Sequence, residues 1–143
     1  MATSEVIYLG NLRTRAKHLA SGTELITDAP VDNKGKGEFF SPTDLVATAY
    51  ACCVLTIMGI GAETHGYDIT NTKVEVTKIM ADNPCRIAEI KTIFTFPADK
   101  HYTKKQKITL VNILKTCPVA LSLSESLKKT VVLNFPDESL TIE

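Results

Sequence analysis

The sequence predicts an α+β fold in which a long buried central helix is packed under an antiparallel sheet. Three observations lead to this prediction. Residues 45–62 form an uncharged stretch without proline that is long enough for a helix. Two runs, residues 68–80 and 86–96, alternate apolar and polar side chains with the period of a half-buried strand. The order of elements also departs from the strict βαβ alternation of a doubly wound sheet.

Length and composition favour one cytoplasmic domain, residues 1–143. A chain of this size buries about two thirds of its surface without cross-links. Sixteen basic and sixteen acidic residues cancel, so charge gives no reason to expect nucleic acid or an acidic membrane as a partner. Four cysteines without a signal-peptide pattern favour a reducing cytoplasm over a disulfide framework.

The N-terminal part is expected to be β-structure followed by a loop. Residues 5–12 and 13–28 are predicted to form two short strands around a turn at residues 20–22, whose sequence is Ala-Ser-Gly. Residues 29–40 contain Pro, Asp, Asn and two Gly, which predicts a loop. Such a loop can lie across a site as a lid.

The central helix is predicted to begin at Pro42. A serine before a proline is a common helix opening, and Asp44 in the first turn suits the positive end of the macrodipole. We expect roughly five to six turns, apolar on nearly every face and so buried on nearly every face. The uncharged run reaches the length of a membrane span, but it lacks flanking Lys/Arg and aromatic belts, so no membrane is expected. Such a helix needs additional cover, which favours a homodimer.

The C-terminal half is expected to continue the sheet and to add two helices. Residues 68–80 and 86–96 predict a long antiparallel hairpin, turning at residues 81–84. From Thr103 the apolar period changes to that of an amphipathic helix. Pro118 is expected to open a further short helix continuing through residues 119–129. Residues 130–135 and 138–143 then predict one or two closing strands.

The four cysteines are the candidate residues for metal binding or catalysis. No two have the CxxC spacing of a zinc site, and the three histidines fall in unrelated elements, so neither a metal nor another cofactor is expected. A Cys–His hydrolase stays open, although no particular histidine is indicated. Cys85 follows Pro84 in the hairpin turn and is expected to be exposed or partly exposed.

Cys53 and Cys117 are the cysteines with distinctive surroundings. Cys117 directly precedes the proline-initiated helix, whose N-terminus is expected to lower the pKa of the thiol. Cys53 lies in the middle of the buried helix, beside Cys52. Each cysteine taken alone fits a small apolar core residue better than a reactive thiol, whereas the two together with their surroundings do not.

The segments SPTDLVATAYACC (residues 41–53) and TCPVALSLSESLK (residues 116–128) resemble the OsmC/Ohr family of osmotically inducible and organic hydroperoxide resistance proteins. The upstream segment ELITDAP (residues 24–30) and the order of elements are similar to that family too. The resemblance implies a thiol peroxidase in which Cys53 attacks an organic hydroperoxide and becomes a sulfenic acid. The resemblance also implies that Cys117 then attacks the sulfenic acid of Cys53 to form a disulfide, which an external dithiol reduces. It also implies an intertwined homodimer with sites at the subunit interface.

One position departs from the family pattern. The peroxidases of the family carry a Glu directly after the helix-opening proline, paired with an Arg from the N-terminal sheet, and here that position is Thr43. On an unbroken helix Thr43 lies about 80° from Cys53, whereas Asp44 lies about 180° from it and about 80° from Cys52. Either the acid is lost, or the site has shifted to Asp44 and Cys52.

The arginine of this pair is expected to be Arg13, by similarity of the early segment RTRA to the family. Arg15 lies on the same strand face and is the alternative. Both can equally be solvent-facing charges.

Two functional hypotheses therefore remain. The first is a peroxidase acting on organic hydroperoxides in the antioxidant response to oxidative stress, with Cys53, Cys117 and Arg13 in the site. The second is a family member without this activity that binds a small apolar ligand, or performs other thiol chemistry, at the dimer interface. The cysteine pair favours the first hypothesis and Thr43 favours the second.

Overall fold

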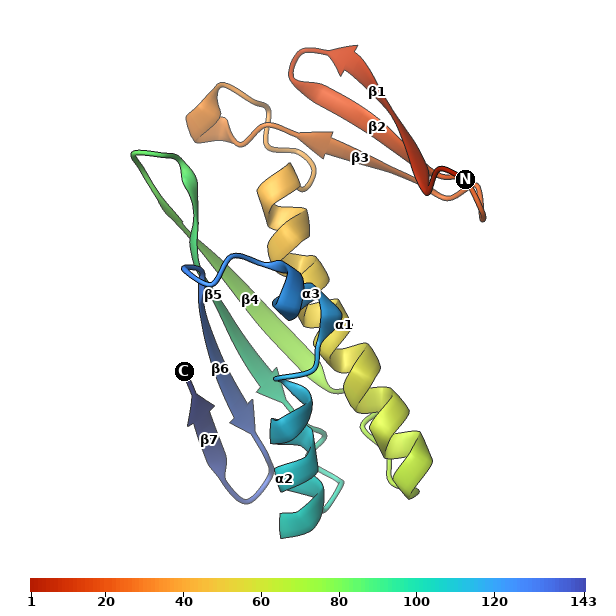
Figure 1. Cartoon of the computed structure of the whole chain (residues 1–143), viewed down its shortest axis with the longest axis vertical. Coiled ribbons are helices and arrows are strands. Elements are labelled where there is room, and N and C mark those ends of the chain that lie inside the picture. Colours follow the sequence, from red (N-terminus) through yellow and green to blue (C-terminus); the bar gives the residue numbers. More distant parts are fainter. The chain divides into compact units, whose positions relative to one another are not determined.

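The computed structural model describes all residues, 1–143, and the chain forms two compact units, residues 1–46 and 47–143. The long helix α1 (Pro42–His65) begins in the first unit and runs on into the second. Two sheets, one in each unit, accompany the helices (Figure 1). The predicted α+β class with a long central helix is confirmed.

The first unit contains an antiparallel sheet in the order β1-β2-β3. The predicted turn at residues 20–22 is present, and the Gly22 N–H donates to the His18 carbonyl at 2.7 Å. The prediction of two strands was wrong, because a further turn with positive φ at Gly10, Asn11 and Leu12 divides the segment. Gly10 and Asn11 favour this conformation, whereas leucine rarely adopts it, and the predicted strand was extended through all three residues. The strands are β1 (Ser4–Gly10), β2 (Arg13–His18) and β3 (Glu24–Asp28).

Residues 29–40 form the predicted loop, interrupted only by a short 3₁₀ helix, η1 (Val31–Asn33). Glycine is required at position 35 because the backbone there passes close to Ala29. A Cβ at this position would lie 1.8 Å from the carbonyl oxygen of Ala29. The path of the loop therefore depends on a residue without a side chain.

Helix α1 begins as predicted. The Asp44 N–H donates to Ser41 Oγ at 3.1 Å, and the Ser41 N–H donates to Asp44 Oδ2 at 3.0 Å, a reciprocal cap. The helix has 24 residues and exceeds the expected five to six turns, because its internal glycines stay helical and the chain turns only at Gly66.

The expectation that α1 is buried on nearly every face was wrong for the single chain. One stripe, including Tyr50, Val54 and Met58, is buried, but Ile60 is 56% exposed. By length and composition α1 could cross a membrane, although the core helix of a soluble protein passes the same test. Its buried stripe is part of the core of the second unit.

The second unit is a four-stranded sheet in the order β4-β5-β6-β7. The predicted hairpin is confirmed as β4–β5, and β6–β7 is also antiparallel, whereas β5 and β6 pair in parallel. The crossover between β5 and β6 carries two helices (Figure 1). The elements are β4 (Lys73–Ala81), β5 (Arg86–Thr95), α2 (Lys104–Ile113), α3 (Pro118–Ser122), β6 (Lys128–Asn134) and β7 (Ser139–Ile142).

The two crossover helices differ in how well the sequence predicted them. Helix α2 starts as expected, with Thr103 and Gln106 forming a capping box. Helix α3 was expected to continue through residues 119–129 but ends at Ser122. After it, the Ser126 N–H donates to Ser124 Oγ at 3.2 Å. Serine side chains that bond to nearby backbone compete with helix formation, which accounts for the early end.

Candidate functional site

The fold brings Cys53 and Cys117 together. Cys53 lies on α1 and is half-buried, whereas Cys117 directly precedes α3 and is fully buried. Cys53 packs against the core cluster that contains Cys117, and it is close enough to raise the pKa of the Cys117 thiol. Cys52 and Cys85 are exposed. Of the two neighbouring cysteines on α1, the one that meets Cys117 is therefore Cys53.

The surroundings of Cys117 raise the pKa of its thiol. Burial is the largest cause, followed by the hydrogen bond to Cys53 and by the charge that Cys53 carries when ionised. The backbone N–H groups of Ala120 and Val119 act in the opposite direction but are outweighed. The expectation of a lowered pKa was wrong, because α3 is one short turn and its N-terminus cannot offset complete burial. Cys117 is thus held in the thiol form, with a proton to donate.

Tyr50 forms part of the wall behind the cysteine pair. It lies one turn before Cys53 on α1, is 1% exposed, and belongs to the same core cluster as Cys117. Burial, and to a lesser extent the neighbouring Cys117, raises the pKa of Tyr50 to about 12. Tyr50 is therefore neutral at physiological pH. The sequence reasoning did not single it out, since it reads as one more apolar position of the helix.

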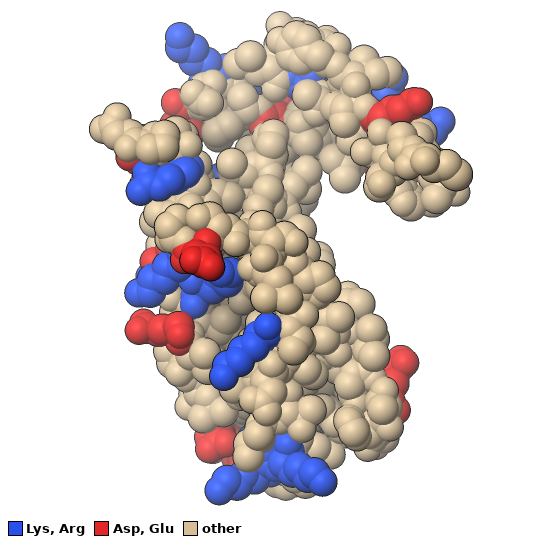
Figure 2. Space-filling view, viewed as in Figure 1, with Lys and Arg blue, Asp and Glu red and all other residues tan.

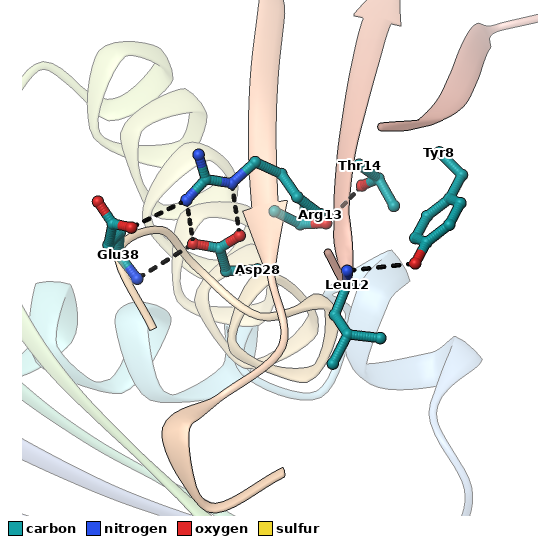
Figure 3. A network of polar contacts seen from close by, with 7 residues as sticks. Tyr8, Leu12, Arg13, Thr14, Asp28 and Glu38 are labelled. Atoms are coloured by element: carbon teal, nitrogen blue, oxygen red, sulfur yellow. Dashed lines mark hydrogen bonds and ion pairs between the residues drawn. The ribbon is translucent and has the colours of Figure 1, made fainter. Parts of the chain in front are cut away.

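Arg13 lies at the start of β2 in the first unit, where two carboxylates hold it (Figure 3). Its Nε donates to Asp28 Oδ1 at 2.7 Å and its Nη2 to Asp28 Oδ2 at 2.9 Å. The same Nη2 donates to Glu38 Oε1 at 3.2 Å. The Phe39 ring lies 4.9 Å below the guanidinium carbon. The hydrogen bonds from Arg13 lower the pKa of Asp28, and Asp28 in turn raises the pKa of Arg13.

Asp28 is the carboxylate that the sequence reasoning missed. Arg13 and Asp28 are directly opposite each other in the β2–β3 ladder. Residues 13–28 were predicted as one strand. Two strands joined by the turn at residues 20–22 place Arg13 opposite Asp28, a cross-strand pair of opposite charges. The alternative arginine, Arg15, lies 3.8 Å from Glu24 in an exposed pair.

The positions at the helix start have local roles. The Thr43 hydroxyl lies 3.2 Å from Ser41 Oγ. Asp44 accepts the Ser41 N–H in the helix cap. No group of three or more His, Cys, Asp or Glu side chains converges as a metal site requires.

The fold and the cysteine pair define a class of protein: an α+β protein with two neighbouring cysteines, one on a long buried helix and one directly before a proline-initiated helix. The chain belongs to the OsmC-like protein family, whose model matches residues 35–132. No curated protein matches the sequence.

Solved structures agree with this assignment. A Psychrobacter arcticus protein, provisionally described as an osmotic stress induced and detoxification response protein, is 48% identical with a TM-score of 0.89. The match covers 94% of this chain and 96% of that one.

Two more distant structures share the fold. An organic hydroperoxide resistance protein OsmC from Legionella pneumophila is 12% identical with a TM-score of 0.71, covering 94% of this chain and 98% of that one. An organic hydroperoxide resistance protein from Elizabethkingia anophelis is 13% identical with a TM-score of 0.63, covering 94% and 96% respectively.

Proposed function

We propose that this protein is a thiol-dependent peroxidase that reduces organic hydroperoxides, with Cys53 as the nucleophile and Cys117 as the resolving thiol. The observation that carries the proposal is the proximity of the two cysteines: Cys53 packs against the buried cluster that contains Cys117 and raises the pKa of its thiol. A reactive cysteine beside a resolving cysteine is the arrangement that sulfenic-acid chemistry needs. The names of distant relatives with this fold point to the same substrate class.

The proposed cycle has three steps. The Cys53 thiolate attacks the terminal oxygen of the hydroperoxide ROOH, the O–O bond breaks, and the departing RO⁻ takes a proton and leaves as the alcohol. Cys53 is now a sulfenic acid. The Cys117 sulfur then attacks the Cys53 sulfur, forming the disulfide, while the sulfenic hydroxyl and the Cys117 proton leave as water. An external dithiol reduces the disulfide by thiol–disulfide exchange.

The protonation of Cys117 suits this division of roles. The nucleophile must be a thiolate, whereas the resolving thiol need react only after the sulfenic acid has formed. A Cys117 held as a thiol by burial can donate a hydrogen bond to the sulfur of Cys53. Arg13 is the proposed cationic partner for the thiolate or the peroxide.

A second candidate function rests on Thr43 and on the partners of Arg13. Thr43 cannot ionise, and Arg13 is already engaged by Asp28 and Glu38. Under this alternative the protein is an OsmC-like protein without peroxidase activity that binds a small apolar ligand or performs other thiol chemistry.

We further propose one OsmC-like domain, residues 1–143, acting in the cytoplasm as a homodimer. The support for a dimer is the apolar surface of β1, where Val6, Ile7 and Tyr8 are 62%, 51% and 64% exposed. A sheet with this many exposed apolar side chains is typical of a surface covered by another protein. Sedimentation of the reduced protein at several concentrations tests this proposal, and a monomer at all of them overturns it.

The test of activity is hydroperoxide consumption with a dithiol reductant. Cumene hydroperoxide and hydrogen peroxide are compared on the wild type and on Cys52→Ser, Cys53→Ser and Cys117→Ser. We expect rapid turnover of the organic peroxide that is lost in the Cys53 and Cys117 variants and kept in Cys52→Ser. Loss in Cys52→Ser alone supports the shifted site with Asp44. Turnover no faster than that of free thiol in every protein overturns the peroxidase proposal and favours the binding alternative.

A further inference from the structure

The two cysteines of the candidate site differ in access from outside. Cys53 is half-buried, whereas Cys117 is 0% exposed. In thiol–disulfide exchange the attacking sulfur has to reach one of the two bonded sulfurs, so the rate of exchange depends on the access to that sulfur. In a disulfide between these two cysteines, Cys53 is therefore the partner that a thiol from outside can approach without opening the core.

Charge does not favour either of the two sulfurs. In Figure 2 no charged side chain covers the surface where α3 and the middle of α1 lie in Figure 1. The main influences on the pKa of Cys117 are burial, Cys53 and backbone N–H groups, with no Lys, Arg, Asp or Glu side chain among them. Burial rather than charge therefore decides which sulfur an external thiol attacks.

The departure of Cys117 is the difficult part of such an attack. A thiol with a lower pKa leaves a disulfide faster, whereas burial raises the pKa of Cys117. The backbone N–H groups of Ala120 and Val119 favour the thiolate of Cys117 but are outweighed. A further hydrogen-bond donor beside Cys117 would therefore speed its departure.

The Tyr50 hydroxyl is a donor of this kind. Tyr50 is 1% exposed and belongs to the core cluster that contains Cys117. It makes no hydrogen bond within the chain, which the structure describes in full. Burial, and then the charge of a neighbouring Cys117 thiolate, raises the pKa of Tyr50 to about 12, so the hydroxyl keeps its proton at neutral pH. A hydroxyl on a buried side chain without an acceptor is costly, and a Cys117 thiolate supplies the acceptor.

We propose that the external dithiol attacks the sulfur of Cys53, and that Cys117 leaves as a buried thiolate that accepts a hydrogen bond from Tyr50. This inference rests on the disulfide of the proposed function and adds the direction of its reduction. A thiolate of the dithiol bonds to Cys53, the bond between the two cysteine sulfurs breaks, and its electron pair goes to Cys117, which then takes a proton from water. The second thiol of the dithiol loses its proton to water and attacks the dithiol's own sulfur in the mixed disulfide. The dithiol leaves oxidised, and Cys53 is released as a thiolate.

The test locates the first adduct on the disulfide. The full-length chain with Cys52→Ser and Cys85→Ser is oxidised with diamide, so that no hydroperoxide turnover is needed, and is then mixed with the monothiol mercaptoethanol. The reaction is stopped early with acid, the chain is unfolded, free thiols are alkylated, and peptide mass spectrometry locates the adduct. We expect mercaptoethanol on Cys53 and a free thiol at Cys117.

The same oxidised protein, unfolded in urea before mercaptoethanol is added, is the control for burial. Both cysteines are then expected to carry the adduct, because both sulfurs are accessible. An adduct on Cys117 in the folded protein, or on both cysteines alike, overturns the inference and leaves the proposed function intact. Failure of diamide to form a disulfide between Cys53 and Cys117 overturns the resolving step of the proposed function and this inference with it.

Tyr50→Phe tests the hydrogen bond to the leaving sulfur, and Tyr67→Phe is its matched control. The Tyr67 hydroxyl is also buried without a partner, but Tyr67 follows the end of α1 and is not among the groups that act on Cys117. We expect dithiothreitol to reduce the oxidised Tyr50→Phe protein about tenfold more slowly than the wild type, because a hydrogen bond to a charged group is lost. Tyr67→Phe is expected to be reduced at the rate of the wild type.

Two further readouts separate this role of Tyr50 from a structural one. In a Cys53→Ser background, Tyr50→Phe is expected to raise the pKa of Cys117, measured by thiolate absorbance, whereas Tyr67→Phe leaves it unchanged. The melting temperature of the reduced Tyr50→Phe protein should equal or exceed that of the wild type, since the hydroxyl has no partner to lose. Equal slowing of reduction by both variants, or an unchanged rate in Tyr50→Phe, overturns the role given to Tyr50.

Discussion

Arg13 and Asp28 form a two-point ion pair across neighbouring strands, with donor–acceptor distances of 2.7 and 2.9 Å. Asp28 has 1% of its side chain exposed and Arg13 has 26%. The Glu38 N–H also donates to Asp28 Oδ2 at 3.1 Å, so the pair ties the end of the 29–40 loop to the sheet. A peroxide that engages Arg13 has to share it with these carboxylates.

Asp28→Asn is expected to destabilise the protein at neutral pH, and the difference from the wild type should disappear in acid. The folded-state pKa of Asp28 is lowered from 3.8. A lowered pKa contributes stability above the unfolded value, and this stability is lost as pH falls through the folded value. Urea unfolding midpoints of both proteins at pH 7 and at a series of pH values that falls well below 3.8 measure the effect.

Asp32→Asn is the control for this experiment. Asp32 lies exposed in η1 and makes no ion pair or hydrogen bond. The unfolding midpoint of the Asp32→Asn protein is expected to follow that of the wild type at all pH values. A gap between the wild type and Asp28→Asn that stays constant from pH 7 to pH 3 contradicts the ion-pair account.

Two glycine-to-alanine substitutions are expected to act in opposite directions. Gly35→Ala places a Cβ 1.8 Å from a backbone oxygen, so the loop must move and the melting temperature should fall. Gly59→Ala lies inside α1 with no atom within 4 Å of the added methyl and should stabilise the helix by about 0.5–1 kcal/mol. Thermal unfolding measures both. A destabilising Gly59→Ala indicates that another molecule covers this face of α1.

The sequence predicted the elements whose signals are local. Ser41 and Pro42 marked the start of α1, and the alternation of β4 and β5 marked the hairpin, because capping and period-two patterns depend on near neighbours. The turn at residues 10–12 was missed although it contains Gly10 and Asn11, because the predicted strand was extended through Leu12. The early end of α3 was missed because no Gly or Pro follows Ser122 there. At the turn, Leu12 adopts a positive φ that its residue type rarely has, and after α3 the serine side chains bond to nearby backbone.

The candidate site was predictable in part. The family resemblance pointed to the two cysteines that the fold brings together. The raised pKa of Cys117 was not predictable, because complete burial depends on tertiary packing around a helix of one turn. Asp28 as the partner of Arg13 depended on the β2–β3 register, which the two-strand prediction concealed.

Thr92→Val is expected to stabilise the protein by about 1–2 kcal/mol. The Thr92 hydroxyl is fully buried in β5 and has no hydrogen-bond partner, so valine removes a desolvation cost while keeping the volume of the side chain. Thr72→Val is the matched control, because the Thr72 hydroxyl donates to the Ile69 carbonyl at 2.6 Å. Thr72→Val should destabilise. Chemical denaturation that gives the same sign for both variants contradicts this explanation.

Cys53→Ala is expected to lower the pKa of Cys117 without returning it to the ordinary value. Cys53 raises that pKa through its hydrogen bond and its charge, but burial is the larger cause and persists in the variant. Thiolate absorbance as a function of pH, in proteins that also carry Cys52→Ser and Cys85→Ser, reports this change. An unaltered Cys117 titration would show that the two thiols do not interact in solution.

The parallel pairing of β5 with β6 has a consequence for the order of folding. The β4–β5 hairpin joins neighbouring segments and can close quickly, whereas β6 reaches β5 only after the whole crossover has been ordered. Contacts that span long stretches of chain form late, because the loop entropy is lost before they are made. Cys117 lies inside that crossover. A nascent or partly unfolded chain therefore keeps its two partner thiols apart, and its redox behaviour should develop only with the last stage of folding.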